Sequence, residues 1–146
     1  MGFIDTIKAR AKADKKTIVL PESEDRRTYE AAAQILKEDL ANLVIIGTPD
    51  DIGAHSEGLD VSGATIINPQ TYEKTQEYID LFVELRKSKG MTPEKAKETI
   101  LSDYAYYGCL MIKNGDADGM VSGACHSTAN TLRPCLQVIK TKPGTK

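Results

Sequence analysis

The fold is decided by residues 118–134, which read DGMVSGACHSTANTLRP. The pattern predicts a short apolar strand, Gly119–Val121, that breaks at Ser122 and Gly123. A polar turn at residues 125–128 and a helix that carries Arg133 in its first turns follow. A strand, a turn and a helix N-terminus in this order present free backbone N–H groups and the helix dipole to an anion. The same order also occurs in ordinary strand-to-helix connections, and the local pattern favours neither interpretation.

Pro134 constrains where this helix begins. Proline disrupts a helix interior but is tolerated in the first turn, so we expect a helix over 132–140 with Thr131 as its N-cap. Arg133 would then stand beside unpaired N–H groups, where a guanidinium binds phosphate through two parallel hydrogen bonds. An earlier start, at Ser127, would require a kink at Pro134.

Outside this stretch, short apolar strands alternate with helices. Strands are predicted at residues 17–20, 42–46, 64–67 and 118–121, and helices at 3–14, 25–38, 49–54, 71–87, 93–101 and 102–113. Strands that are almost entirely apolar are typical of a sheet covered on both faces. We therefore expect the α/β class, as a three-layer αβα domain around a mainly parallel sheet.

Composition excludes several classes of function. Hydrophobic residues make up 40% of the chain and charged residues 27%, as in soluble globular proteins. The net charge of −2 gives no electrostatic case for nucleic acid, and no apolar run approaches the roughly 18 residues of a membrane span. Three cysteines without close spacing suit a reducing compartment. We expect a cytoplasmic protein with no nucleic-acid or membrane partner.

Other reactive side chains receive plainer interpretations. Cys125 and His126 are adjacent in sequence, so their side chains point different ways and we do not expect a nucleophile pair. No group of Cys, His and Asp residues has metal-ligand spacing, so we expect no metal, and His126 is interpreted as a residue that orients its loop. Glu22 and Glu24 are interpreted as a solvated turn, and Cys109 as a core residue.

Four segments of the chain resemble the N-terminal part of the phosphate acetyltransferase (phosphotransacetylase) family. They are TIVLPESEDRRTYEAA (17–32), LANLVIIG (40–47), ELRKSKGMT (84–92) and DADGMVSGACHSTANTLRPCLQVIKTKPG (116–144). The last segment is long and specific, and it favours the anion site over the ordinary connection. The resemblance implies that residues 1–146 are the N-terminal segment of the first domain of an isocitrate/isopropylmalate dehydrogenase-like fold. It also implies that this domain is incomplete, and that the second domain and the C-terminal segment are absent.

The resemblance implies reversible acetyl transfer between coenzyme A and phosphate, which gives acetyl phosphate. Coenzyme A and acetyl-CoA would be substrates, with no tightly bound cofactor and no cofactor-binding residue assigned here. The family motifs place the two phosphoryl-binding arginines at Arg133 and Arg86, and we add Ser127 and Thr128 as donors because of their position and polarity. The family's catalytic base belongs to the absent C-terminal segment, so the isolated chain is expected to lack it.

Alternatives remain open at the level of sequence. One is a non-catalytic phosphate-binding or regulatory module, like the family-like domains appended to malic enzymes. Another is a phosphate butyryltransferase, because acyl chain length depends on a pocket outside this sequence. The family often has Asp at position 130, and Asn130 leaves Arg133 freer to bind a ligand. A homodimer or self-association is expected, because a half-domain exposes apolar surface.

Overall fold

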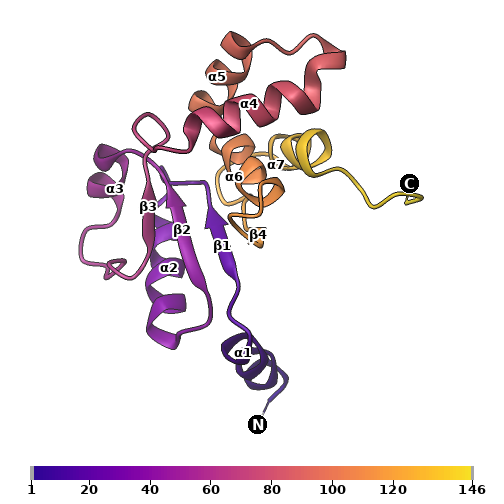
Figure 1. Cartoon of the computed structure of the whole chain (residues 1–146). Helices are drawn as coiled ribbons and strands as arrows, with labels where there is room; N and C mark the ends of the chain where they lie inside the picture. Colours follow the sequence, from indigo (N-terminus) through magenta and orange to yellow (C-terminus); the bar gives the residue numbers. More distant parts are fainter. Residues whose placement is uncertain (1, 146) are drawn as a thin grey trace.

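Four parallel strands form one sheet in the part of the chain that the computed structural model describes, residues 2–145. Their order is β3-β2-β1-β4, and Figure 1 shows them at the centre of the molecule. The strands are β1 (Thr17–Leu20), β2 (Asn42–Ile46), β3 (Thr65–Ile67) and β4 (Gly119–Met120). The predicted α/β class and parallel sheet are confirmed, with β4 shorter than predicted.

Helices occupy most of the remaining chain, largely where the sequence predicts them. They are α1 (Phe3–Ala13), α2 (Arg26–Glu38), α3 (Pro49–His55), α4 (Thr75–Arg86), α5 (Pro93–Ser102), α6 (Tyr104–Lys113) and α7 (Thr128–Pro134), with a 3₁₀ turn η1 (Lys87–Lys89) and a π-helical segment η2 (Cys135–Ile139). Several starts follow from capping side chains. Asp25, for example, accepts the backbone N–H of Arg27 at the start of α2.

The two faces of the sheet bury alternate residues of each strand. Val19 and Val44 belong to a core cluster with residues of α4, α5 and α6. Leu20 and Leu43 belong to a second cluster with Tyr29 and other residues of α2. Figure 1 shows α4, α5 and α6 grouped away from α2 and α3. Helices therefore cover both faces, as expected for a three-layer αβα arrangement.

Two cysteines contact each other at the core cluster that contains Val19 and Val44. Cys109 of α6 is fully buried, so its interpretation as a core residue is confirmed. Its Sγ lies 3.7 Å from the Sγ of Cys135, which begins η2. Both are free thiols. The sequence spacing of 26 residues gave no indication of this contact.

The last helix begins earlier than predicted. Ser127, not Thr131, is the N-cap, and its Oγ accepts the backbone N–H of Asn130 at 3.1 Å. Pro134 therefore lies in the last turn of α7, and the five residues after it form the π-helical η2. Both Ser127 and Thr131 are competent caps, and the wider π turn accommodates the proline that a regular helix would resist. Arg133 consequently stands in the last turn and not in the first.

The first helix lies apart from the sheet, near the N-terminus in Figure 1. The helix contributes no buried residue, and its apolar side chains Phe3, Ile4 and Ile7 are exposed by 78%, 60% and 44%. An ion pair of 2.6 Å between Lys8 and Glu38 joins it to the end of α2. Among residues 2–145, no helix is both long and apolar enough to cross a membrane.

Candidate functional site

The strand order places a topological switch point between β1 and β4. From β1 the chain proceeds through β2 to β3 on one side, and β4 then pairs with the opposite edge of β1. In parallel α/β sheets, ligands bind outside the carboxyl ends of the strands at such a point. The loops that follow β1 and β4 meet here, and together they carry Glu22, Glu24 and residues 122–127.

The side chain of Glu22 joins these two loops through hydrogen bonds. Its Oε1 accepts the backbone N–H groups of Gly123 and Ala124 at 2.7 and 2.9 Å, and its Oε2 accepts that of Cys125 at 2.8 Å. The side chain is only 3% exposed. Burial alone would raise the pKa of Glu22, but the N–H groups of Cys125, Ala124 and Gly123, with the Cys125 thiol, hold it at about 2. The interpretation of Glu22 as a solvated residue is therefore wrong, whereas Glu24 is exposed.

The backbone N–H groups after β4 are thus already bound to an anion of the protein itself. The sequence predicts that they are free for a ligand, and for Gly123, Ala124 and Cys125 this prediction is wrong. The physical reason is non-local. The carboxylate comes from a loop about 100 residues earlier, which the parallel pairing of β1 and β4 brings alongside.

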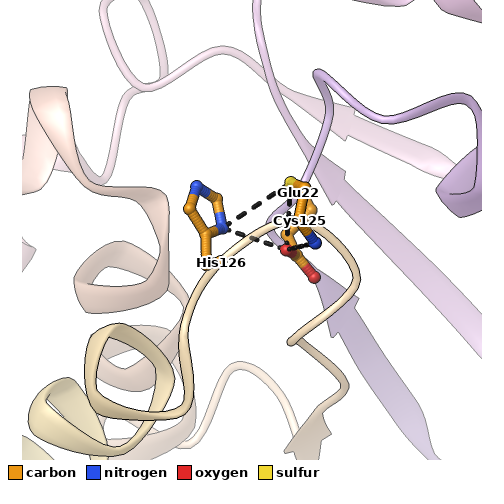
Figure 2. Close-up of side chains that lie close together, drawn as sticks. All are labelled: Glu22, Cys125 and His126. Carbon is orange, nitrogen blue, oxygen red and sulfur yellow. Dashed lines mark hydrogen bonds and ion pairs between the residues drawn. The ribbon is translucent and has the colours of Figure 1, made fainter.

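Cys125 and His126 extend the contacts of Glu22 (Figure 2). His126 Nδ1 lies 3.0 Å from Glu22 Oε2, and its Nε2 lies 2.9 Å from Glu24 Oε1. The prediction that His126 orients the loop is therefore confirmed. The statement that no group has metal-ligand spacing is wrong in three dimensions, because donor atoms of Glu22, Cys125 and His126 lie within 4.8 Å of one another.

The thiol of Cys125 is unsuited to act as a nucleophile. Burial raises its pKa, and its hydrogen bonds to the carboxylates of Glu22 and Glu24 raise it further. Its Sγ lies 3.8 Å from His126 Nδ1. Because the thiolate is the reactive form, negative charge on two sides keeps this thiol protonated.

Arg27 supports the same loop from its other side. Its guanidinium donates to the carbonyl oxygen of Ala124 and forms an ion pair of 2.6 Å with Asp25. This role was not predicted from the sequence. The positive charge of Arg27 is therefore committed to structure.

The two arginines assigned by resemblance both affect the pKa of Tyr106 in α6. They are Arg86 and Arg133. Burial, and then the nearby Asp103, raise the pKa of Tyr106, and the positive charges of Arg133 and Arg86 oppose this rise. The Tyr106 hydroxyl donates to Gln137 Oε1 at 3.0 Å, so α4, α6 and the segment after α7 converge here.

Both arginines retain unused hydrogen-bonding capacity. Within residues 2–145, neither Arg86 nor Arg133 has a carboxylate within ion-pair distance, in contrast to Arg27. The Nε of Arg86 is buried and has no acceptor in the same part of the chain. A buried donor without a partner is costly, and an anion is the natural acceptor for a guanidinium.

Ser127 and Thr128 lie at the other end of α7 from Arg133. The Oγ of Ser127 caps the helix by accepting the N–H of Asn130, and both residues are exposed. Six residues of helix separate Ser127 from Arg133 by roughly 9 Å along the axis. The charges of both arginines act on Tyr106, whereas Ser127 and Thr128 lie at the opposite end of α7 from Arg133.

A cavity of about 440 Å³ opens beside the loops at the switch point. Its charged lining consists of Glu24, Asp51 and Asp103, together with the imidazole of His126. Neither Arg86 nor Arg133 lines it. Three carboxylates disfavour an anion, so this cavity is not the place for phosphate.

Comparison with known proteins shows which family this chain resembles. Residues 2–146 match the family described as phosphate acetyl/butaryl transferase. The chain belongs to this family. It is 53% identical over 146 residues to a phosphate acetyltransferase of Thermoanaerobacterium thermosaccharolyticum and 52% identical to one of Acetivibrio thermocellus. In both cases the match covers 100% of this chain and 44% of the relative.

Solved phosphotransacetylases have the same fold over this length. The EutD phosphotransacetylase of Staphylococcus aureus matches with a TM-score of 0.88 at 40% identity, over 98% of this chain and 43% of that one. A phosphotransacetylase of Streptococcus pyogenes matches with a TM-score of 0.89 at 39% identity, over 100% of this chain and 45% of that one. The chain therefore spans less than half the length of the family members it matches.

Proposed function

We propose that this chain forms the N-terminal part of a phosphate acetyltransferase, which transfers an acetyl group reversibly between coenzyme A and phosphate. The observation that carries the proposal is that neither Arg86 nor Arg133 has an ion-pair partner within residues 2–145, while the positive charges of both act on Tyr106. They come from helices far apart in the sequence. A compact dianion such as phosphate matches two planar, permanently charged donors.

In this reaction the thiolate of coenzyme A attacks the acetyl carbonyl of acetyl phosphate. A C–S bond forms, the bond between the carbonyl carbon and the bridging oxygen breaks, and phosphate leaves with the electron pair. Arg86 and Arg133 hold the phosphoryl group and stabilise the charge that develops on it. Coenzyme A and acetyl-CoA act as substrates, and the base that deprotonates the thiol belongs to the rest of the protein.

The remaining assignments extend this proposal. Ser127 and Thr128 are exposed at the start of α7, where their hydroxyls are available to a substrate that bridges toward Arg133. The three free thiols suit a cytoplasmic enzyme. Exposed apolar side chains on α7 and η2, Leu132 and Leu136, favour association with further protein surface, either the rest of the enzyme or a second copy.

A chimera tests the proposal directly. It joins this chain to the remaining C-terminal part of the Thermoanaerobacterium relative, and formation of acetyl-CoA from acetyl phosphate and coenzyme A is measured. We expect turnover in the chimera and none in the isolated chain. Arg133→Ala and Arg86→Ala should each reduce kcat/KM on the order of 10²–10³-fold, as for other groups that stabilise transition-state charge.

Arg10→Ala provides the matched control, because Arg10 is an exposed residue of α1 and lies outside the proposed site. Its kcat/KM should equal that of the parent chimera. A folded chimera without turnover, or one in which both arginine variants retain full activity, would overturn the assignment. Calorimetric titration of phosphate into the isolated chain then reports whether the two arginines bind the anion before the second domain is added.

A further inference from the structure

We propose that Glu22, Cys125 and His126 form a binding site for one divalent metal ion of the zinc class. Three chemically different donor atoms meet at this point (Figure 2). Cys125 Sγ lies 3.1 Å from Glu22 Oε2, His126 Nδ1 lies 3.0 Å from the same oxygen, and Sγ and Nδ1 are 3.8 Å apart. These atoms form a small triangle around one position.

The triangle has the size of one face of a tetrahedral zinc site. Zinc binds sulfur at about 2.3 Å and nitrogen or oxygen at about 2.0–2.2 Å, so its donor atoms are separated by roughly 3.3–3.6 Å. The observed separations of 3.0, 3.1 and 3.8 Å lie within a few tenths of an ångström of this range. Side-chain rotation at the exposed Cys125 and His126 is sufficient to close the difference.

The donor set selects the kind of ion. A thiolate with an imidazole and a carboxylate suits zinc and similar transition ions, whereas magnesium and calcium prefer oxygen ligands throughout. The negative charges of one thiolate and of Glu22 balance a divalent cation. The ion would take the place of the thiol proton that Cys125 now donates to Glu22 Oε2, and this proton would leave to solvent.

His126 is already oriented for this role. Its Nε2 lies 2.9 Å from Glu24 Oε1, so with an ion on Nδ1 the second ring nitrogen would donate its N–H to this carboxylate. Carboxylates that accept the second N–H of a metal-bound histidine are typical of zinc sites.

The carboxylate of Glu22 is also held in place by hydrogen bonds. Its Oε1 accepts the backbone N–H groups of Gly123 and Ala124, which fix the carboxylate while Oε2 faces the triangle. His126 and Glu24 also line the cavity of about 440 Å³, so an ion has an entry path and water has access to a fourth position. A bound ion would join the loop after β1 to the loop that precedes α7.

Titration with Co²⁺ and then Zn²⁺ tests the site in the chain as it stands, after reduction and removal of metal. We expect one Co²⁺ per chain, with the visible absorption of a tetrahedral ion and a thiolate-to-cobalt band in the near ultraviolet. Zn²⁺ should displace Co²⁺ and abolish both signals. A folded chain that binds no Co²⁺ stoichiometrically overturns the proposal.

Variants assign the ligands. Cys125→Ser should abolish the thiolate band, and His126→Gln should weaken the binding of Zn²⁺. Glu24→Gln removes the carboxylate that faces His126 Nε2 and should weaken the binding of Zn²⁺ by roughly 10–100-fold. Circular dichroism verifies that each variant is folded, and Cys125 and His126 are exposed, so their replacement leaves the core unchanged.

Cys135→Ser is the matched control, because Cys135 lies 3.7 Å from Cys109 in a second pair of sulfur atoms. The proposal expects Cys135→Ser to bind Co²⁺ as the parent does. Binding that survives Cys125→Ser and disappears in Cys135→Ser would assign the ion to the cysteine pair and refute the proposed site. None of these readouts depends on acetyl transfer, so the metal site and the proposed function stand or fall separately.

Discussion

Glu22 Oε1 accepts the backbone N–H of Gly123 at 2.7 Å, a contact between residues 101 positions apart. Glu22→Gln removes the charge and leaves fewer acceptors for the three N–H groups of residues 123–125. Hydrogen bonds to a charged group contribute about 1.5–3 kcal/mol, and a buried donor without a partner is costly. We therefore expect Glu22→Gln to lower the free energy of unfolding by about 1.5–3 kcal/mol, measured by urea denaturation at neutral pH.

Glu24→Gln is the control for this change, because it is the same substitution at an exposed carboxylate in the same loop. Its side chain is 44% exposed and contacts His126 and Cys125 from the solvent side. Exposed pairs contribute about 0–1 kcal/mol. An equal loss of stability in the two variants would show that the buried backbone contacts of Glu22 carry no special weight.

Gly108 of α6 has no room for a side chain. A Cβ at this position would lie 2.8 Å from Met120 Sδ and 3.0 Å from Val19 Cγ1. Alanine gains about 1 kcal/mol of helix propensity over glycine, whereas overpacking in a core costs about 1–3 kcal/mol. The clash dominates, because Val19 is fully buried in the central strand. We expect Gly108→Ala to destabilise the chain by up to about 2 kcal/mol in thermal or urea unfolding.

Gly53→Ala separates packing from propensity. Gly53 lies in α3, and a Cβ there meets nothing within 4 Å. Only the helix-propensity gain remains, so this variant should be as stable as the parent or up to about 1 kcal/mol more stable. The packing argument fails if Gly108→Ala also increases stability.

Arg133→Lys distinguishes charge from geometry at the proposed phosphate site. Lysine retains the positive charge of Arg133 but cannot form two parallel hydrogen bonds to one phosphoryl group. In the chimera we expect kcat/KM to fall at least about tenfold, which corresponds to about 1.4 kcal/mol, and less than in Arg133→Ala. Full activity in Arg133→Lys would show that charge alone suffices, and steady-state kinetics with acetyl phosphate decide between these outcomes.

Local sequence pattern was sufficient for most of the fold. The apolar runs of β1 and β2 have no other stable location than a sheet covered on both faces, and caps such as Asp25 and Thr92 mark helix starts that the structure reproduces. The start of α7 was missed because Ser127 and Thr131 are both competent caps, and Pro134 favoured the later one. The π-helical segment that resolves the conflict leaves no local signal.

The candidate site was less accessible to sequence reasoning, since its main contacts are non-local. Nothing near Glu22 indicates that its carboxylate occupies the N–H groups of residues 123–125, because the contact depends on the pairing of β1 with β4. Arg86 and Arg133 were found through family resemblance, and spacing alone gave no reason to pair them.

The stability of the chain should depend on pH through Asp116, which lies outside the candidate functional site. Its carboxylate accepts hydrogen bonds from Tyr78, Lys74 and Asn114, at 2.7, 2.9 and 2.8 Å, and so connects the start of β4 to α4 and α6. Burial alone would raise the pKa of Asp116, but the bonds from Asn114, Tyr78 and Lys74 outweigh it and lower the pKa below its ordinary value. The carboxylate is therefore more acidic in the folded chain than in the unfolded chain.

The direction of this pKa shift decides how the stability of the fold changes with pH. A group whose pKa is lower in the folded state stabilises the protein fully above its unfolded pKa, about 3.9 for Asp, and this contribution is lost as pH falls through the folded pKa. Asp116→Asn should cost about 1–3 kcal/mol at neutral pH, and the difference from the parent should shrink as pH falls below about 4. Urea denaturation of both proteins across this range isolates Asp116 from the other carboxylates. A difference that stays constant with pH would show that Asp116 titrates alike in the folded and unfolded chains.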